Sequence, residues 1–192
     1  MKICIYGASS NAIDKSFINA GERLGAALAD RGHSVIFGGG AAGLMGAVAR
    51  GAYSKGGEII GISPSFFNVD GALFTHCTDM IYTDTMRERK KLLEEMSDAF
   101  IITPGGIGTF DEFFEIYTLR QLGVHKKPIA IFNTGGYYDP LINMLNNAIE
   151  KSFMPDTNMN LLFISDDENK IIEHIANYDP KDYEAAQFKF IK

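Results

Sequence analysis

The 192-residue chain has only two cysteines and contains no long apolar run. Cys4 and Cys77 are too few for a disulfide framework, which favours a reduced, cytoplasmic setting. No segment approaches the roughly 20 apolar residues that a membrane-spanning helix needs. The first residues also lack a signal-peptide pattern. We therefore expect a soluble, cytoplasmic protein without a membrane partner.

Positive charge is also scarce. The chain has 18 Lys and Arg against 24 Asp and Glu, giving a formal net charge of −6. No basic stripe offsets this balance, so a nucleic-acid partner is not expected. An anionic ligand would instead have to be held locally, by helix N-termini and by single basic side chains.

Motifs for metal and covalent chemistry are missing as well. The four histidines show no metal-ligand spacing among themselves or with the cysteines. The sequence contains no Gly-x-Ser-x-Gly elbow and no Walker Gly-Lys-Ser/Thr. We therefore expect neither a metal site nor a serine or cysteine nucleophile.

Short apolar segments alternate with longer segments of helical periodicity along the chain. Most strand candidates are continuously apolar, which is typical of strands covered by helices on both faces. This pattern predicts a single α/β domain over residues 1–192, with a doubly wound, mostly parallel, Rossmann-like sheet. The predicted strands are 3–6, 34–37, 58–62, 80–83, 99–103, 129–133 and 161–165. The predicted helices are 14–31, 44–54, 87–96, 111–122, 138–151 and 167–177. The exception is 63–79, which has no clear periodicity and is typical of a lid or pocket wall.

Three predicted strands end in small, flexible residues. These turns are Gly7-Ala8-Ser9-Ser10, Gly38-Gly39-Gly40 and Gly105-Gly106. In a doubly wound sheet, ligands bind outside the carboxyl ends of the strands, near the point where the strand order reverses. The three turns are therefore predicted to line one crevice.

The most informative segment is Pro104-Gly105-Gly106-Ile107-Gly108-Thr109-Phe110-Asp111-Glu112, which joins a predicted strand to a predicted helix. Glycines permit close backbone approach, and the free N–H groups of a helix's first turn favour a phosphate. The carboxylate of Glu112 lies nearby and suggests chemistry in addition to binding. Alternatively, Thr109-x-x-Glu112 matches a capping box, although a capping box needs no glycines. Both interpretations can hold together.

Two other segments have competing interpretations. Gly38-x-Gly40-x-x-Gly43 matches a dinucleotide fingerprint, but it follows the second strand and lacks the acidic residue expected about 20 positions later. Close approach to a nucleotide or to another helix is the better explanation. In 85–91, basic residues stand at a helix start, where they oppose the helix dipole. Arg89 and Lys90 are therefore functional candidates, whereas their neighbours are typical of a solvated face.

Together, the 38–46 glycine segment, Met86-x-x-Arg89-Lys90 and the 104–112 segment resemble the Lonely Guy family of cytokinin riboside 5′-monophosphate phosphoribohydrolases, many of them long mislabelled as lysine decarboxylases. The resemblance covers nearly the whole chain. It implies hydrolysis of the N-glycosidic bond of a cytokinin riboside 5′-monophosphate or AMP, giving free base and ribose 5-phosphate. It also implies a homodimer, and no nicotinamide, metal or pyridoxal cofactor.

Carried over onto this sequence, the family pattern makes Arg89 and Glu112 the catalytic pair. The implied substrate-binding residues are Ser9, Gly39, Gly40, Met86, Lys90, Gly105, Gly106, Gly108 and Thr109. Some positions depart from the pattern. Ile107 replaces a common aromatic residue, Asp111 precedes Glu112 where a second glutamate is common, and 65–71 lacks the usual Met-Pro-Arg-Glu wall beside the base. The alternative from another class is a non-catalytic carrier of a nucleotide-like ligand, such as the molybdenum cofactor carrier proteins, which share the fold.

Overall fold

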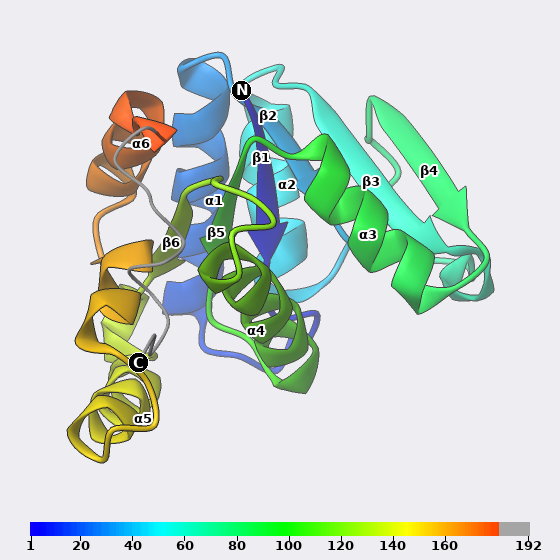
Figure 1. The fold of residues 1–192 in the computed structure, drawn as a ribbon. Helices are drawn as coiled ribbons and strands as arrows, with labels where there is room; N and C mark the ends of the chain where they lie inside the picture. The colour runs from blue at the N-terminus through cyan, green and yellow to red at the C-terminus, as the bar shows by residue number, and fades with distance from the viewer. Residues whose placement is uncertain (181–192) are drawn as a thin grey trace.

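The computed structural model describes residues 1–180, which form a seven-stranded sheet flanked by helices (Figure 1). The end of the predicted domain, 181–192, lies outside the described residues. The strands are β1 (Lys2–Tyr6), β2 (Ser34–Phe37), β3 (Ile59–Pro64), β4 (Asp79–Thr83), β5 (Ala99–Ile102), β6 (Ile129–Phe132) and β7 (Leu162–Ser165). The α-helices are α1 (Lys15–Asp30), α2 (Gly43–Ser54), α3 (Met86–Met96), α4 (Ile107–Gln121), α5 (Asp139–Glu150) and α6 (Glu168–Asn177). Short 3₁₀ turns are η1 (Ser65–Phe67), η2 (Thr134–Gly136) and η3 (Asp156–Leu161).

The sheet has the order β4-β3-β2-β1-β5-β6-β7, and all of its neighbouring strands are parallel. The chain runs outward from β1 to β4, then returns through α3 to place β5 on the other side of β1. The strand order therefore reverses between β1 and β5, where such sheets hold their ligands. The predicted doubly wound, parallel α/β fold is confirmed.

Helices cover both faces of the sheet because the strands are apolar on both faces. Leu24 of α1, Val48 of α2 and Ile172 of α6 belong to the core on one face. Leu93 of α3 and Phe113 of α4 belong to the core on the other face, which α5 also covers. Figure 1 shows α3 and α4 side by side in one layer, in front of the central strands. This layer carries the residues of the candidate site.

Helix α4 differs most from its predicted bounds. It begins at Ile107, four residues before the predicted start, and Gly106 is its N-cap. The glycines were expected to form only the turn, but the Phe110 N–H already donates to the Gly106 carbonyl at 3.0 Å. Gly108 therefore belongs to the first turn of the helix, and Glu112 lies in its second turn.

The connection between β3 and β4 folds back over the turn that follows β2. The Phe74 N–H donates to the Gly39 carbonyl at 2.8 Å, and the Ala41 N–H donates to the Ala72 carbonyl at 3.0 Å. The segment predicted to be a lid or wall thus lies against one of the three glycine-rich turns. Among residues 1–180, no helix is long and apolar enough to cross a membrane.

Candidate active site

The three turns predicted to share one crevice meet at the carboxyl edge of the sheet. The Ala8 N–H donates to the Pro104 carbonyl at 3.0 Å, and the Met45 N–H donates to the Ala8 carbonyl at 3.1 Å. Ser9 is exposed beside Gly43, where an added Cβ would lie 2.7 Å from the Ser9 carbonyl carbon. The turn after β1 therefore lies between the turns after β2 and β5, as the sequence predicts.

The turn before α4 combines a packed glycine with open ones. A Cβ on Gly105 would lie 2.1 Å from the Thr109 Oγ1, so the helix can close against this turn only if the residue is glycine. Gly106 and Gly108 are exposed, and an added Cβ at either position would meet nothing within 4 Å in the described part of the chain. The N–H groups of the first helical turn have no carbonyl one turn earlier to bond. This end of α4 therefore offers donors to an anion, with glycines leaving room around them.

The capping-box interpretation of Thr109 and Glu112 is wrong. The N-cap of α4 is Gly106, and no side chain caps this helix. A capping box is present at α3 instead, where the Thr85 hydroxyl accepts from the Glu88 N–H at 3.2 Å and the Glu88 carboxylate accepts from the Thr85 N–H at 3.1 Å. Glu88, expected to lie on a solvated face, thus fixes the start of the helix that carries Arg89.

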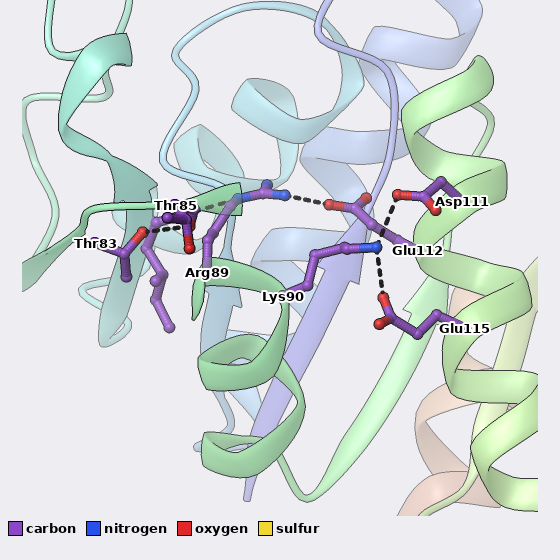
Figure 2. A network of polar contacts seen from close by, with 8 residues as sticks. Thr83, Thr85, Arg89, Lys90, Asp111, Glu112 and Glu115 are labelled. Carbon is purple, nitrogen blue, oxygen red and sulfur yellow. Dashed lines mark hydrogen bonds and ion pairs between the residues drawn. The ribbon is translucent and has the colours of Figure 1, made fainter. Parts of the chain in front are cut away.

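Arg89 and Glu112 form a buried ion pair between α3 and α4 (Figure 2). The Arg89 Nη1 lies 2.5 Å from the Glu112 Oε1, and each residue is only 8% exposed. The Arg89 Nε also donates to the Ile62 carbonyl in β3 at 3.3 Å. A Cβ on Gly38 would lie 2.0 Å from the Arg89 Nη2, so the first glycine after β2 makes room for the guanidinium. The structure therefore brings together the residues that the sequence predicts as the catalytic pair.

The charge of Glu112 is set by opposing effects. Burial raises the pKa of Glu112, while the adjacent Arg89 guanidinium opposes this shift. The predicted helix 111–122 would place Glu112 in the first turn, where the helix dipole favours the anion. In the structure Glu112 lies in the second turn of α4, where this effect is weaker. Arg89, rather than the helix end, is therefore the main stabiliser of the carboxylate.

We expect the pKa of Glu112 in the free protein to lie above the ordinary glutamate value of about 4.3. The carboxyl should accordingly take up its proton at a higher pH than an exposed glutamate does. Side-chain ¹³C NMR on glutamate-labelled protein, with the signal assigned from its loss in Glu112→Gln, measures this directly. A Glu112 signal that titrates at or below the ordinary glutamate value of about 4.3 would contradict the prediction.

Lys90 does not point freely into solvent. Its Nζ lies 3.1 Å from the Asp111 Oδ2 and 2.8 Å from the Glu115 Oε2, two carboxylates one turn apart on α4 (Figure 2). The hydrogen bond to Glu115 is the largest cause that raises the pKa of Lys90, which keeps the ammonium charged. The sequence predicts Lys90 as a substrate-binding residue but does not identify these two partners.

The remaining predicted binding residues differ in how far they are exposed to solvent. Met86 is exposed at the first position of α3. Gly40 is partly exposed, whereas Gly39 is buried beneath the 65–78 connection with φ of +79°. Sequence reasoning also missed Tyr137, whose hydroxyl donates to the Gly105 carbonyl at 2.7 Å and supports the turn before α4. Its position just after the β6 strand end is the signal that could have identified it.

Metal-ligating clusters and reactive thiols are two common alternatives for catalysis. Residues 1–180 contain no group of three or more His, Cys, Asp or Glu side chains placed to hold a metal ion. Burial raises the pKa of the Cys4 thiol to about 12, and burial likewise raises that of Cys77 to about 11. Thiols with such pKa values make poor nucleophiles at neutral pH.

Comparison with known proteins identifies relatives over most of the chain. A family profile described as "Possible lysine decarboxylase" matches residues 45–175. A cytokinin riboside 5′-monophosphate phosphoribohydrolase of Arabidopsis thaliana is 30% identical over 180 residues, which cover 94% of this chain and 84% of that protein. A protein of the same name from Mycobacterium tuberculosis is 39% identical over 165 residues, which cover 85% of this chain and 87% of that protein.

Solved structures share the fold at lower sequence identity. The molybdenum cofactor binding protein of Rippkaea orientalis superposes with a TM-score of 0.68 at 22% identity, covering 91% of this chain and 94% of that chain. The molybdenum cofactor carrier protein of Chlamydomonas reinhardtii gives 0.67 at 18% identity, covering 91% and 95%. These similarities concern the fold alone. The profile match and the curated relatives, in contrast, show that this chain belongs to the Lonely Guy family.

Proposed function

We propose that this protein hydrolyses the N-glycosidic bond of a nucleoside 5′-monophosphate, releasing the free base and ribose 5-phosphate. The observation that carries the proposal is the buried Arg89–Glu112 pair, at the edge of the sheet where the glycine-rich turns meet. The names of the curated relatives support the same reaction class. The specific substrate is either a cytokinin ribotide or AMP.

The chemistry of this bond explains why a carboxylate is needed. As the carbon–nitrogen bond breaks, its electron pair leaves with the base and positive charge develops on the sugar ring. A Glu112 carboxylate beside the ring would stabilise this charge and orient the water whose oxygen bonds to the anomeric carbon. The proton lost by the water balances the proton gained by the departing base. Arg89 would fix the orientation of Glu112 through its planar donor fork.

The phosphate would bind at the N-terminal end of α4. We assign it to Gly106, Gly108 and the backbone of Thr109, because this helix end carries unpaired N–H donors. With a net charge of −6, the chain needs such local donors to hold an anion. Ser9, Gly40 and Met86, which are at least partly exposed, are the nearest candidates for contacts to the rest of the nucleotide.

The open space around Gly108 gives a specific prediction. Gly108→Ala adds a Cβ that meets no atom of residues 1–180 within 4 Å, and alanine in a helix is more favourable than glycine by roughly 1 kcal/mol. We therefore expect an unchanged or slightly higher melting temperature. The KM for a nucleoside monophosphate should nevertheless rise by about tenfold, because the methyl group crowds the phosphate. Parallel kinetics with the corresponding nucleoside, which has no phosphate, provide the control. An equal effect on both substrates would place the phosphate elsewhere.

The function is tested by measuring free base released from AMP and from N6-prenylated AMP. We expect release from at least one of them, with adenosine and ADP as poorer substrates. The ratio of the two kcat/KM values then identifies the preferred base. Tight nucleotide binding by folded protein without any base release would contradict the proposal and favour a carrier.

We also propose that the protein forms a homodimer. Helix α4 begins with Ile107, which is 82% exposed, beside the candidate site. Phe110 and Phe114, further along α4, are only partly buried. An apolar stripe that continues beyond the core face is typical of a helix covered on a second side. Light scattering coupled to size exclusion should give twice the mass of the 21.1 kDa chain.

A further inference from the structure

Lys90 lies between two carboxylates of α4, immediately next to the proposed catalytic Arg89. Its side chain is only 18% exposed, and its Nζ contacts Asp111 at 3.1 Å and Glu115 at 2.8 Å. These partners, four residues apart, share one exposed face of α4, and the buried Glu112 lies between them in the sequence. Two of the three N–H donors of the ammonium already face carboxylates of α4, and a role as a simple phosphate ligand does not explain these two contacts.

The ion pairs connect two helices whose backbones contact each other little. Although α3 and α4 lie in one layer, their principal backbone contacts are with strands and short turns rather than with each other. Arg89 and Lys90 are consecutive residues that both reach across to α4, one to Glu112 and the other to its two acidic neighbours (Figure 2). The ion pairs of Arg89 and Lys90 start from adjacent positions on α3 and end at different positions on α4. Together they restrict both the distance between the two helices and the rotation of α4 about its axis.

The acidic side chains on this part of α4 also require a second cation in addition to Arg89. Asp111, Glu112 and Glu115 place three carboxylates on one part of α4, and Arg89 is paired only with the middle one. Burial is the largest cause that raises the pKa of Glu112 and Asp111 adds to it, whereas Arg89 and, to a smaller extent, Lys90 lower it. Lys90 thus offsets the repulsion that Asp111 exerts on Glu112, and it reduces the negative charge that an incoming phosphate meets.

We propose that Lys90 is a positioning residue, which bridges Asp111 and Glu115 to hold Glu112 in place against Arg89. This inference rests on the proposed function for its kinetic consequences, but not for its structural ones. Lys90 acts through α4 and makes no contact with the substrate in this role.

Kinetics of Lys90→Met separate positioning from binding. We expect kcat to fall by about 10- to 100-fold, as small misplacements of catalytic groups cause, while KM changes by about twofold or less. Lys90→Arg should recover most of the loss, and Glu115→Gln should reproduce part of it. Lys91→Met is the matched control, because Lys91 is an exposed lysine on the same helix whose ion-pair partner within residues 1–180 is Glu95, at 3.7 Å. It should leave the kinetics unchanged.

Two outcomes would overturn the proposal. A KM increase of about tenfold at unchanged kcat, which disappears with a nucleoside that lacks phosphate, would make Lys90 a phosphate ligand. Full activity in Glu115→Gln together with Asp111→Asn would show that the bridge has no role.

A structural measurement keeps the test independent of turnover. The Arg89 Nε–H is buried and should give a protected ¹⁵N–¹H signal, assigned from its absence in Arg89→Lys. We expect Lys90→Met to broaden or shift this signal and Lys91→Met to leave it in place. If the wild-type protein releases no base but Lys90→Met perturbs the signal, the proposed function fails while the positioning role stands. An unperturbed signal in Lys90→Met contradicts the positioning role itself.

Discussion

Glu112→Gln is expected to lower kcat for base release by roughly 10³-fold, within the range lost when one catalytic acid–base or electrostatic group is removed. Glutamine has the same shape and keeps an oxygen that can accept from the Arg89 Nη1. It cannot, however, supply the negative charge that stabilises the developing cation on the sugar. Binding of the phosphate should persist, because the donors at the start of α4 are unchanged.

Stability measurements must accompany this variant. Removing one charge of a buried ion pair leaves the other uncompensated, which typically costs about 3–5 kcal/mol when no hydrogen bond replaces it. Because glutamine retains an acceptor, we expect a smaller loss and a folded protein. Glu173→Gln, an exposed substitution on the opposite face of the sheet, should change neither property. Base release within about tenfold of wild type in Glu112→Gln would exclude Glu112 from the chemistry.

Gly38→Ala is the second substitution with a large expected effect on activity. The added Cβ would lie 2.0 Å from the Arg89 Nη2 and 3.2 Å from the Met45 Sδ. Both are atoms of flexible side chains, so the protein can fold if the guanidinium moves. Moving it breaks the 2.5 Å contact with Glu112. We expect a loss of about 100-fold in kcat/KM, together with a lower melting temperature because the buried ion pair is disrupted.

Gly46→Ala gives the matched comparison. Its Cβ would also lie 2.0 Å from another atom, but that atom is the carbonyl oxygen of Ala41 in the backbone. Backbone relocates less readily than the end of an arginine, so Gly46→Ala should lose stability rather than activity per folded molecule. Thermal melts and kinetics on both variants test the distinction. Wild-type activity per folded molecule in Gly38→Ala would show that Gly38 is needed for packing and not for the position of Arg89.

Much of this fold could be predicted from the sequence because buried parallel strands are apolar on both faces. All seven predicted strands are present, and the 34–37 prediction matches β2 at both ends. The start of α4 was predicted too late because glycine usually interrupts helices, whereas here Gly106 caps the helix and Gly108 lies inside it. Local residue preferences could not show that contacts with the rest of the protein favour a start of α4 at Ile107.

The candidate site was predictable only in part. The resemblance to the Lonely Guy family implied Arg89 and Glu112 as the catalytic pair, but their direct contact depends on how α3 crosses the sheet, which no local pattern specifies. The same limitation explains why Thr109-x-x-Glu112 resembled a capping box while the box at Thr85 and Glu88 was not recognised. Lys90 was identified without Asp111 and Glu115, because ion pairs between separate helices leave no periodic signal in the sequence.

The hydrogen bond from Arg89 to the Ile62 carbonyl has an evolutionary consequence. This acceptor belongs to the main chain of β3, so substitution of the Ile62 side chain does not remove it. The neighbouring 65–71 segment, in which Phe66 and Phe67 are exposed, can therefore change its side chains without removing the anchor of the arginine. A new substrate preference could arise in this segment while the proposed catalytic pair of Arg89 and Glu112 is inherited intact.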